Sequence, residues 1–358
     1  MNSDAWYAVP GKDNDVVLSS RVRFARNLAN FPFPAKLRGS DGERIQAIVF
    51  DAYNHFDDSE SYQAISVQQL DNVGREILVE RGVLDASTEG KYCGVVMRSD
   101  GKVSCTVNNV DHVRISSFST GLDFDAALSA GRYVDASLQK SVQFAASYDF
   151  GYLTSSLFDA GSGMKLSVRV HLPALSLLGK IGSTGDMLSK KGFTFSATYG
   201  LGAKGSSLGA FYQVSSLNSL SGSEFDQVAS LTAAVQQLTE QERLARKQCM
   251  ESEQTAVRNQ VYRALALCKY SKLLELREAI SLISGIQLGL DTKLLSGVDD
   301  SVVHALLYRM QDGHLEFVLK NGDFQFEEDI AQNMLRKKER LRALIVQEAF
   351  EAISVTGE

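Results

Sequence analysis

The sequence predicts an α+β protein in which a mainly antiparallel sheet flanked by helices is followed by an all-helical C-terminal domain. Three observations lead to this fold class. Short apolar runs separated by turn residues recur through the first two-thirds of the chain, helical periodicity interrupts them, and residues 224–281 contain neither Pro nor Gly. Hairpins interrupted by helices are typical of α+β domains. The change in composition near residue 222 predicts two domains, 1–221 and 222–358.

The elements of the first domain follow from periodicity. The apolar runs 92–98 and 102–107 flank Ser99-Asp100-Gly101, a turn of the kind that joins antiparallel strands. Further strands are expected at 16–26, 113–118, 166–172, 193–199 and 210–217. Apolar spacing predicts an amphipathic helix over 124–146, and Pro173 is placed to open a helix that runs to Leu188.

The second domain is expected to be helical throughout. Residues 224–281 are rich in Leu, Ala, Gln and Glu, the composition of long packed helices. Residues 327–353 carry apolar side chains at helical spacing among dense charges. Five apolar residues suit either a homodimer interface or the core of the chain itself: Leu265, Leu273, Leu274, Leu276 and Ile280.

Composition excludes several functional classes. Hydrophobic residues make up 44% and charged residues 22%, which indicates a folded chain. A net charge of -6 argues against a nucleic-acid partner. No apolar run approaches the ~20 residues of a membrane span, and the first residues lack a secretion signal, so a cytoplasmic protein without membrane contact is expected. The four cysteines show no Cys-x-x-Cys spacing, and no metal site is predicted.

The strongest local signal for a functional site lies in residues 19–27. In a strand, Val22 and Phe24 point into the core, while Arg21 and Arg23 project together from the opposite face. Two parallel guanidinium groups form a fork that suits phosphate oxygens. A solvated strand face is the competing interpretation.

The same alternation gives two other strands a cationic face. Opposite the apolar positions we expect Val110, His112 and Arg114 on one strand, and Lys165, Ser167, Arg169 and His171 on the other. Together the three faces would form an electropositive cleft for a nucleotide polyphosphate. For both histidines a structural role is an equally good interpretation.

A Gly-rich segment over residues 199–205 is a weaker candidate. Its glycines would let backbone N–H groups approach an anion, but Lys204 is not followed by Ser or Thr and no helix is expected to begin there. A flexible hairpin loop explains the segment equally well.

Several ordered motifs resemble the ATP:guanidino phosphotransferase family. Residues 17–27, Val-Leu-Ser-Ser-Arg-Val-Arg-Phe-Ala-Arg-Asn, are similar to its opening signature, and residues 108–115 resemble its Asn-Glu-Glu-Asp-His-x-Arg-Ile motif. Residues 150–156, 161–163 and 170–175 follow in the expected order. Beyond these, the helical C-terminal region is similar in length and character to that of the bacterial protein-arginine kinases of the McsB type.

The resemblance implies the guanidino kinase catalytic fold and transfer of the γ-phosphoryl group of Mg-ATP to an arginine side chain of a protein. In this family arginines hold the nucleotide phosphates, and carboxylates hold the guanidinium and can accept its proton. Position by position, Arg21, Arg23 and Arg114 match three of the phosphate-binding arginines.

The remaining catalytic positions of the family carry other residues in this chain. Asn109 and Val110 stand where the family has paired glutamates, and Leu201 replaces the glutamate of the later loop. Ser156 replaces the reactive cysteine. Lys165 and Ser196 replace two phosphate-binding arginines. A general base is worth ~10²–10⁴ in rate, so the resemblance implies impaired catalysis.

Two acids lie near these positions in the sequence, and a second site of the family has its counterpart in the C-terminal region. Asp159 and Asp111 are the candidates to substitute for the lost carboxylates, although alternation places Asp111 on the face opposite Arg114. McsB-type kinases also recognise phosphoarginine through an Arg-Asp-x-x-Arg-Ala motif. The corresponding positions Glu328, Asp329 and Gln332 keep only the Asp, which implies a degenerate sensor.

These observations lead to three hypotheses. The first is a pseudokinase that acts as a binding, adaptor or regulatory protein, with Mg-ATP or ADP binding weakened or lost. The second is an active protein-arginine kinase that uses Asp159, Asp111 or Arg169 in unfamiliar roles. The third is a nucleotide- or phosphate-sensing subunit built on the retained arginines. The resemblance also implies a homodimer and protein partners, namely an McsA-like activator, a ClpC-like unfoldase or client proteins.

Overall fold

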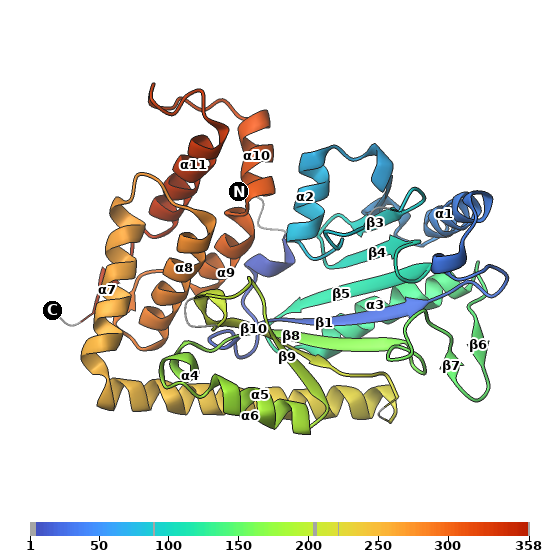
Figure 1. Ribbon diagram of the computed structural model, residues 1–358, viewed down its shortest axis with the longest axis horizontal. Helices are drawn as coiled ribbons and strands as arrows, with labels where there is room; N and C mark the ends of the chain where they lie inside the picture. Colours follow the sequence, from blue (N-terminus) through green and yellow to red (C-terminus); the bar gives the residue numbers. More distant parts are fainter. Residues whose placement is uncertain (1–4, 89, 203–205, 221, 357–358) are drawn as a thin grey trace.

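The computed structural model describes residues 5–88, 90–202, 206–220 and 222–356, and it shows a sheet in one half of the molecule and helices in the other (Figure 1). The strands are β1 (Val17–Arg26), β2 (Tyr62–Ser66), β3 (Gly94–Arg98), β4 (Val103–Val107), β5 (Val113–Thr120), β6 (Ala146–Ser147), β7 (Gly151–Tyr152), β8 (Met164–His171), β9 (Phe193–Ala197), β10 (Phe211–Ser216), β11 (Leu295–Ser296) and β12 (Ser354–Val355). The helices are α1 (Gly39–Asn54), α2 (Asn72–Glu80), α3 (Phe124–Gln139), α4 (Pro173–Leu177), α5 (Ile181–Lys190), α6 (Glu224–Ser252), α7 (Gln254–Tyr270), α8 (Leu276–Asp291), α9 (Asp300–Arg309), α10 (Asp312–Asn321) and α11 (Met334–Ala349).

The main sheet has eight strands in the order β2-β3-β4-β5-β1-β8-β10-β9, and every neighbouring pair in it is antiparallel. Strand β1 therefore lies at the centre, between β5 and β8. This confirms the predicted α+β class with an antiparallel sheet and a helical C-terminal region. In the described parts of the chain, no helix is long and apolar enough to cross a bilayer.

One face of the sheet is buried under helices. Helix α3 packs against β1 and β5, and α6 packs against β8 and β10. Close approach of α3 depends on Gly131, where an added Cβ would lie 2.8 Å from the Ser117 hydroxyl and 3.0 Å from the Phe24 ring. The opposite face of the central strands is left for polar side chains. The candidate site lies on that face.

Three predicted helices have different bounds in the structure. The helix expected over 124–146 ends at Gln139. The helix expected over 173–188 is two helices, α4 and α5, because Gly179 adopts φ +66° between them. The C-terminal helix begins only at Met334, where the side chain of Asn333 caps it by accepting from the Arg336 N–H.

Helix α6 connects the sheet to the C-terminal helices. It begins with a capping box, in which Ser223 and Asp226 bond each other's backbone N–H groups. Although α6 follows the predicted boundary at residue 222, it packs along the sheet, and one contiguous apolar core includes both parts of the chain. The division into 1–221 and 222–358 stays a prediction.

The apolar residues considered for a dimer interface lie mainly inside the chain. Leu265, Leu274 and Ile280 are buried in the core, and Leu273 and Leu276 are half-buried. The intrachain interpretation therefore accounts for this surface, and a homodimer remains a prediction. All four cysteines are free and buried, as expected for reduced thiols.

A buried ion network fixes α6 against its neighbours. The Arg246 guanidinium lies 3.1 Å from carboxylate oxygens of Asp15, Glu242 and Asp291. Glu242 in turn accepts 3.0 Å hydrogen bonds from the first N–H groups of α4, at Ala174 and Leu175. One guanidinium thus serves three carboxylates, and burial raises the pKa of Asp291 to about 7 although Arg246 and Gln287 act in the opposite direction.

Replacement of Asp291 by Asn is expected to make the variant progressively more stable relative to the parent as pH rises. A carboxyl whose pKa is raised on folding stabilises the protein below its unfolded pKa of about 4, and this contribution is lost as pH rises through the folded value. Urea unfolding should show that the free energy of unfolding of Asp291→Asn, relative to that of the parent, rises by a few kcal/mol between pH 4.5 and pH 8. The exposed Asp323→Asn is the control. A difference that does not change with pH would contradict the prediction.

Candidate functional site

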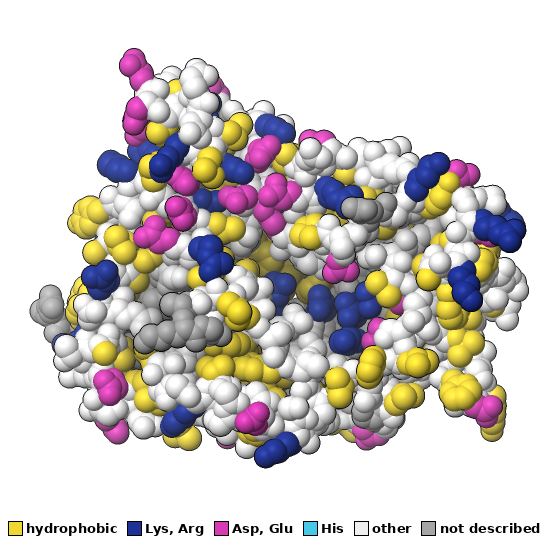
Figure 2. All heavy atoms as spheres, in the orientation of Figure 1, with side chains coloured by type: hydrophobic (Ala, Val, Ile, Leu, Met, Phe, Trp, Pro, Cys, Tyr) yellow, Lys and Arg dark blue, Asp and Glu magenta, His cyan; other side chains and the backbone are white. Residues whose placement is uncertain are grey.

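Five cationic side chains gather on the open face of the central strands. Arg23 of β1 is paired across the sheet with Lys165, Ala25 with Arg114, and Ser19 with Arg169. We call Arg21, Arg23, Arg114, Lys165 and Arg169 the cation cluster. Figure 2 shows Lys and Arg side chains gathered in a hollow over β1, β5 and β8. The predicted meeting of three cationic strand faces is confirmed for these five residues.

The cation cluster has too few anionic partners in the fold to balance its positive charge. The side chains of Arg23 and Lys165 make no hydrogen bond or ion pair within the described part of the chain, and the buried Nε of Arg114 has no partner there. Burial, followed by Arg114, lowers the pKa of Arg23 to about 10. Burial, followed by Arg23 and Arg169, lowers the pKa of Arg21 to about 9. A bound phosphoryl group would relieve this repulsion and supply the missing acceptors.

Partners within the fold hold two members of the cation cluster in place. The Arg21 Nε donates to the Ser167 hydroxyl at 3.0 Å, and its guanidinium lies 5.9 Å from the centre of the Phe118 ring. The Arg169 Nη1 donates to the Tyr308 hydroxyl of α9 at 3.4 Å. Tyr308 also stacks on Tyr7, so the N-terminal segment and α9 close this side of the site. These contacts make the positions of Arg21 and Arg169 independent of a ligand.

A larger cavity lies beyond this aromatic boundary. Its volume is about 830 Å³, and it lies between the β3–β4 hairpin and helices α9 and α11. Phe118 and Tyr308 line it, so the same two rings separate it from the cation cluster. The cavity is continuous with the molecular surface and adjoins the site without containing any of the five cations.

Two carboxylates lie near the cation cluster. Asp159 has an oxygen 3.4 Å from Arg114 Nη2, and only 8% of its side chain is exposed. Asp85, in the turn after α2, opposes the fall in the pKa of Arg21 and Arg23 that burial and neighbouring arginines produce. Sequence reasoning singled out Asp159 but missed Asp85, because nothing in an exposed turn about sixty residues away indicates where its carboxylate lies. Neither acid removes the excess of positive charge.

The segment 108–112 is a hairpin loop between β4 and β5, and this corrects one expectation. Asn108 adopts φ +53°, and its N–H bonds to the His112 carbonyl, so strand alternation does not extend back beyond Val113. His112 is fully buried: its Nδ1 accepts from the Leu28 N–H, and its Nε2 bonds to the Pro32 carbonyl. The placement of His112 on the cationic face is therefore wrong. Burial lowers its pKa, and its role is to anchor the loop.

The other residues of this loop have separate surroundings. Val110 is 38% exposed. Asp111 is buried, and one of its oxygens accepts from the Asn27 amide at 2.9 Å and the Ser155 N–H at 2.7 Å. Its second oxygen has no hydrogen-bond partner among the described residues. Asp111 thus ties the hairpin loop to the segment that carries Ser156, while Asn109 occupies the turn itself.

The remaining predicted positions are not brought to the cation cluster by any described contact. The Leu201 carbonyl accepts from Arg277 of α8 at 2.7 Å, and the leucine side chain is exposed. Residues 203–205 of the same loop, including Lys204, lie outside the described residues. Ser196 pairs with Gln213 at the β9 edge and is exposed. Glu328, Asp329 and Gln332 lie exposed in the turn before α11.

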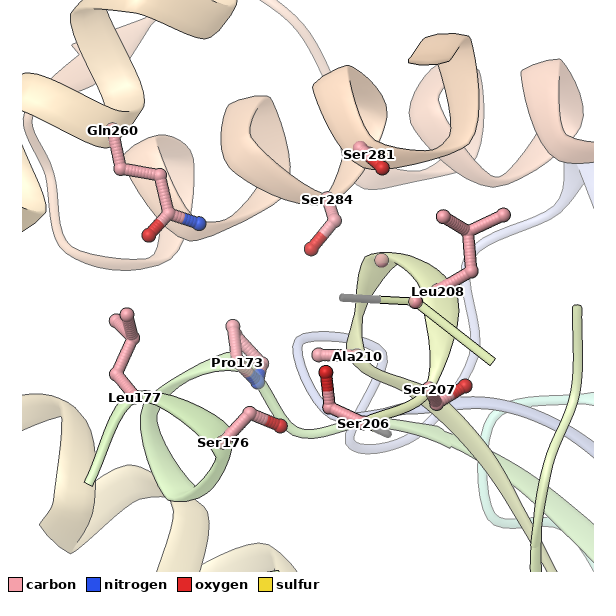
Figure 3. Close-up of a pocket in the computed structure, with 12 residues that line it drawn as sticks. Pro173, Ser176, Leu177, Ser206, Ser207, Leu208, Ala210, Gln260, Ser281 and Ser284 are labelled. Atoms are coloured by element: carbon pink, nitrogen blue, oxygen red, sulfur yellow. The ribbon is translucent and has the colours of Figure 1, made fainter. Parts of the chain in front are cut away.

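His171 lies behind a second, smaller cavity. This cavity of about 290 Å³ is lined by α4, the 206–210 segment and the facing sides of α7 and α8 (Figure 3). Its hydroxyl groups are used internally: Ser284 bonds to His171 Nε2 at 2.7 Å, Ser207 to the Phe211 carbonyl, and Ser281 to the Arg277 carbonyl. His171 also stacks on Phe211 and is buried, and burial lowers its pKa well below the usual value. The structural interpretation of His171 accounts for these contacts.

Comparison with known proteins agrees with the geometry. Residues 44–245 match the model described as ATP:guanido phosphotransferase, C-terminal catalytic domain, and residues 254–358 match that of the protein-arginine kinase McsB C-terminal domain. The chain is 32% identical over 308 residues to a protein-arginine kinase of Syntrophomonas wolfei, with 85% of each chain covered. It is 30% identical over 339 residues to one of Pelotomaculum thermopropionicum, with 93% of this chain and 95% of the relative covered.

Solved structures show the same fold at lower identity. A duplicated taurocyamine kinase from Schistosoma mansoni, with bound transition state analog components, superposes with a TM-score of 0.58 at 21% identity, covering 65% of this chain and 34% of that one. A lombricine kinase superposes with a TM-score of 0.55 at 18% identity, covering 70% and 71%. The predicted resemblance to guanidino kinases is confirmed for both sequence and fold.

Proposed function

The chain belongs to the ATP:guanido phosphotransferase family, in its protein-arginine kinase branch, and from that premise we propose that it is a pseudokinase that binds phosphoryl groups and serves as an adaptor or regulatory protein. The observation that carries this proposal is the imbalance of the site. The cation cluster provides five positive groups, while the positions that supply substrate carboxylates in the family hold Val110 and Leu201.

Phosphoryl transfer to a guanidinium needs more than a phosphate cradle. A guanidinium is cationic, so it must be drawn towards a site of like charge and must lose a proton before its nitrogen can attack phosphorus. Carboxylates perform both tasks. In this chain Asp159 is already paired with Arg114, and Asp111 has one oxygen held by the backbone and an amide. Loss of a general base alone costs ~10²–10⁴ in rate.

The residues present fit the phosphates of Mg-ATP or Mg-ADP. Arg23 and Lys165 lack partners in the described chain, and the buried Arg114 Nε is unpaired, so all three can donate to phosphate oxygens. When bound, the nucleotide would supply the phosphoryl group that the family transfers. Arg21 would orient it from the Ser167 side of the sheet. The replacements at Lys165 and Ser196 argue for weaker binding than in the family.

An active kinase is the second candidate, and Asp159 favours it. Its carboxylate is the acid within 3.4 Å of a cation-cluster residue, and an incoming guanidinium could compete with Arg114 for it. If this candidate is right, purified protein incubated with labelled ATP and an arginine-rich client will accumulate acid-labile label, and Asp159→Asn will abolish it. If the protein is a pseudokinase, the label on the client will not exceed the background seen with an Arg21→Ala control.

Partners and location are proposed on the family resemblance alone. We propose protein partners, namely an McsA-like activator, a ClpC-like unfoldase or client proteins, together with a homodimer in the cytoplasm. The sensor positions argue against phosphoarginine sensing at the C-terminal motif, because Glu328 repels a phosphate, and the neighbouring Arg340 already pairs with Glu327 at 3.0 Å. Pull-down with the purified chain tests the partners directly.

Replacing Arg23 by Gln is expected to weaken binding of Mg-ADP and of pyrophosphate by about 10–100-fold, because a charge-assisted hydrogen bond is worth about 1.5–3 kcal/mol. Thermal shift and calorimetric titration measure the effect. The matched control is Arg132→Gln, which removes an exposed arginine paired with Glu224. Wild-type protein that shows no shift with either ligand at millimolar concentration, or an Arg23→Gln variant that binds as tightly as the control, would contradict the proposed function.

A further inference from the structure

A group of bulky apolar side chains is exposed beside the cation cluster. Leu157 and Phe158 are 84% and 62% exposed, and Leu220 and Phe225 are 63% and 78% exposed. In the neighbouring β6–β7 hairpin, Tyr148 and Phe150 are also exposed. We call these six residues the apolar rim. Isolated exposed apolar residues need no explanation, but a contiguous group of large ones marks an interaction surface.

Hydrogen bonds and packing join the three segments of the apolar rim into one surface. The Ser219 N–H donates to the Phe158 carbonyl at 2.8 Å. Gly161 pairs with Tyr152 through two backbone hydrogen bonds, which holds the β6–β7 hairpin to the turn that carries Leu157 and Phe158. The Leu220 side chain lies against Gly161, 3.1 Å from where a Cβ would stand. These contacts fix the backbone of the segments relative to one another, so a partner would need to order only the rim side chains.

The apolar rim adjoins the cation cluster through two consecutive residues of the chain. Phe158 is followed directly by Asp159, whose carboxylate lies 3.4 Å from Arg114 Nη2. In Figure 2, apolar side chains surround the lower and right-hand edge of the hollow that contains the Lys and Arg side chains. Consecutive residues of an extended chain are spaced by about 3.3–3.6 Å. A single short peptide can therefore contact both surfaces at once.

We propose that the apolar rim and the cation cluster together bind a phosphorylated polypeptide segment, with the phosphoryl group in the cation cluster and adjoining bulky apolar side chains on the rim. Charge complementarity selects this occupant. The cation cluster has unpaired donors that suit a dianion, and the six apolar side chains of the rim suit bulky apolar side chains of the same segment. A free nucleotide would satisfy the cations but would leave the rim exposed. This inference rests on the proposed function, because it takes the cation cluster to be a phosphoryl site.

The test uses a fluorescent peptide with the sequence Leu-Phe-phosphoserine-Leu-Phe, titrated by anisotropy, with pyrophosphate as a competing ligand. Removal of the phosphate and the Arg23→Gln variant are each expected to weaken peptide binding by at least tenfold. A Leu220→Ser/Phe225→Ser variant, altered only at the rim, should weaken peptide binding by about tenfold. It should leave the affinity for pyrophosphate unchanged. Phe317→Ser, at an exposed residue of α10, is the matched control.

The possible outcomes separate this inference from the proposed function. If the wild-type protein binds neither pyrophosphate nor the peptide, the cation cluster is not a phosphoryl site and the proposed function fails. If pyrophosphate binds but the rim variant binds the peptide as tightly as the control, only the further inference is overturned. If sedimentation shows that the rim variant dissociates a dimer that the control retains, the rim contacts a second copy of the chain, and the inference is likewise overturned. Phosphoarginine in place of phosphoserine then tests which phosphorylated side chain is preferred.

Discussion

Replacing Arg26 by alanine is expected to lower the free energy of unfolding by about 3–5 kcal/mol. Replacing Arg23 by glutamine, three residues earlier in the same strand, is expected not to lower it, because burial and the like charge of Arg114 already disfavour the charged form of Arg23. Arg26 lies on the buried face of β1 and is 1% exposed. Its Nε and Nη2 donate to the two carboxylate oxygens of Asp135 at 2.9 and 3.1 Å. Its guanidinium also stacks over the Tyr152 ring at 3.6 Å.

The loss at Arg26 is large because Asp135 would remain buried without its partner. A carboxylate left unpaired in the core costs its full desolvation, whereas replacing both partners by apolar residues is often nearly neutral. Urea unfolding of Arg26→Ala, Arg23→Gln and the double variant Arg26→Met/Asp135→Leu measures the difference. The double variant should recover most of the stability. If Arg26→Ala unfolds at the same urea concentration as the parent, the ion pair does not contribute as the geometry indicates.

Arg23 and Arg26 also show which features of the strand could be predicted from the sequence and which could not. Strand alternation correctly placed Val22 and Phe24 in the core and Arg21 and Arg23 on the opposite face. By the same periodicity Arg26 belongs to the buried side, yet a local pattern gives no reason for a charged residue to be buried. The reason is Asp135, which lies on α3 and is 109 residues away in the sequence. Local periodicity thus predicts the face of a strand but not the distant partner.

The features that the sequence did not predict have the same kind of cause. His112 was expected to face outward because alternation was extended through residues 108–112, but a single residue with positive φ at Asn108 makes that segment a hairpin loop. Asp85 approaches Arg21 and Arg23 only because α2 and its following turn fold over the sheet. The resemblance supplied the identity of the site residues, whereas the contacts of Tyr308 with Arg169 could be seen only in the folded chain.

Restoring the carboxylates is expected to raise phosphoryl transfer by about 10²–10⁴-fold, the contribution of a general base. The variant is Val110→Glu/Leu201→Glu in a Lys165→Arg/Ser196→Arg background, because losses within one catalytic unit are not additive and the phosphate cradle must also be complete. Val110 and Leu201 are 38% and 63% exposed, so glutamate can be accommodated at both positions without burying a charge.

The matched control carries Val110→Gln/Leu201→Gln in the same background, which keeps the size and hydrogen-bonding capacity of the new side chains but not their charge. Transfer of label from ATP to an arginine-rich client is measured for both variants and for the parent. Glutamate and glutamine variants of equal rate would show that missing carboxylates do not limit the reaction. If the parent protein already transfers phosphate as fast as the glutamate variant, Asp159 would be identified as the carboxylate that replaces the missing glutamates. Its carboxylate lies beside Arg114 and is placed to hold the guanidinium.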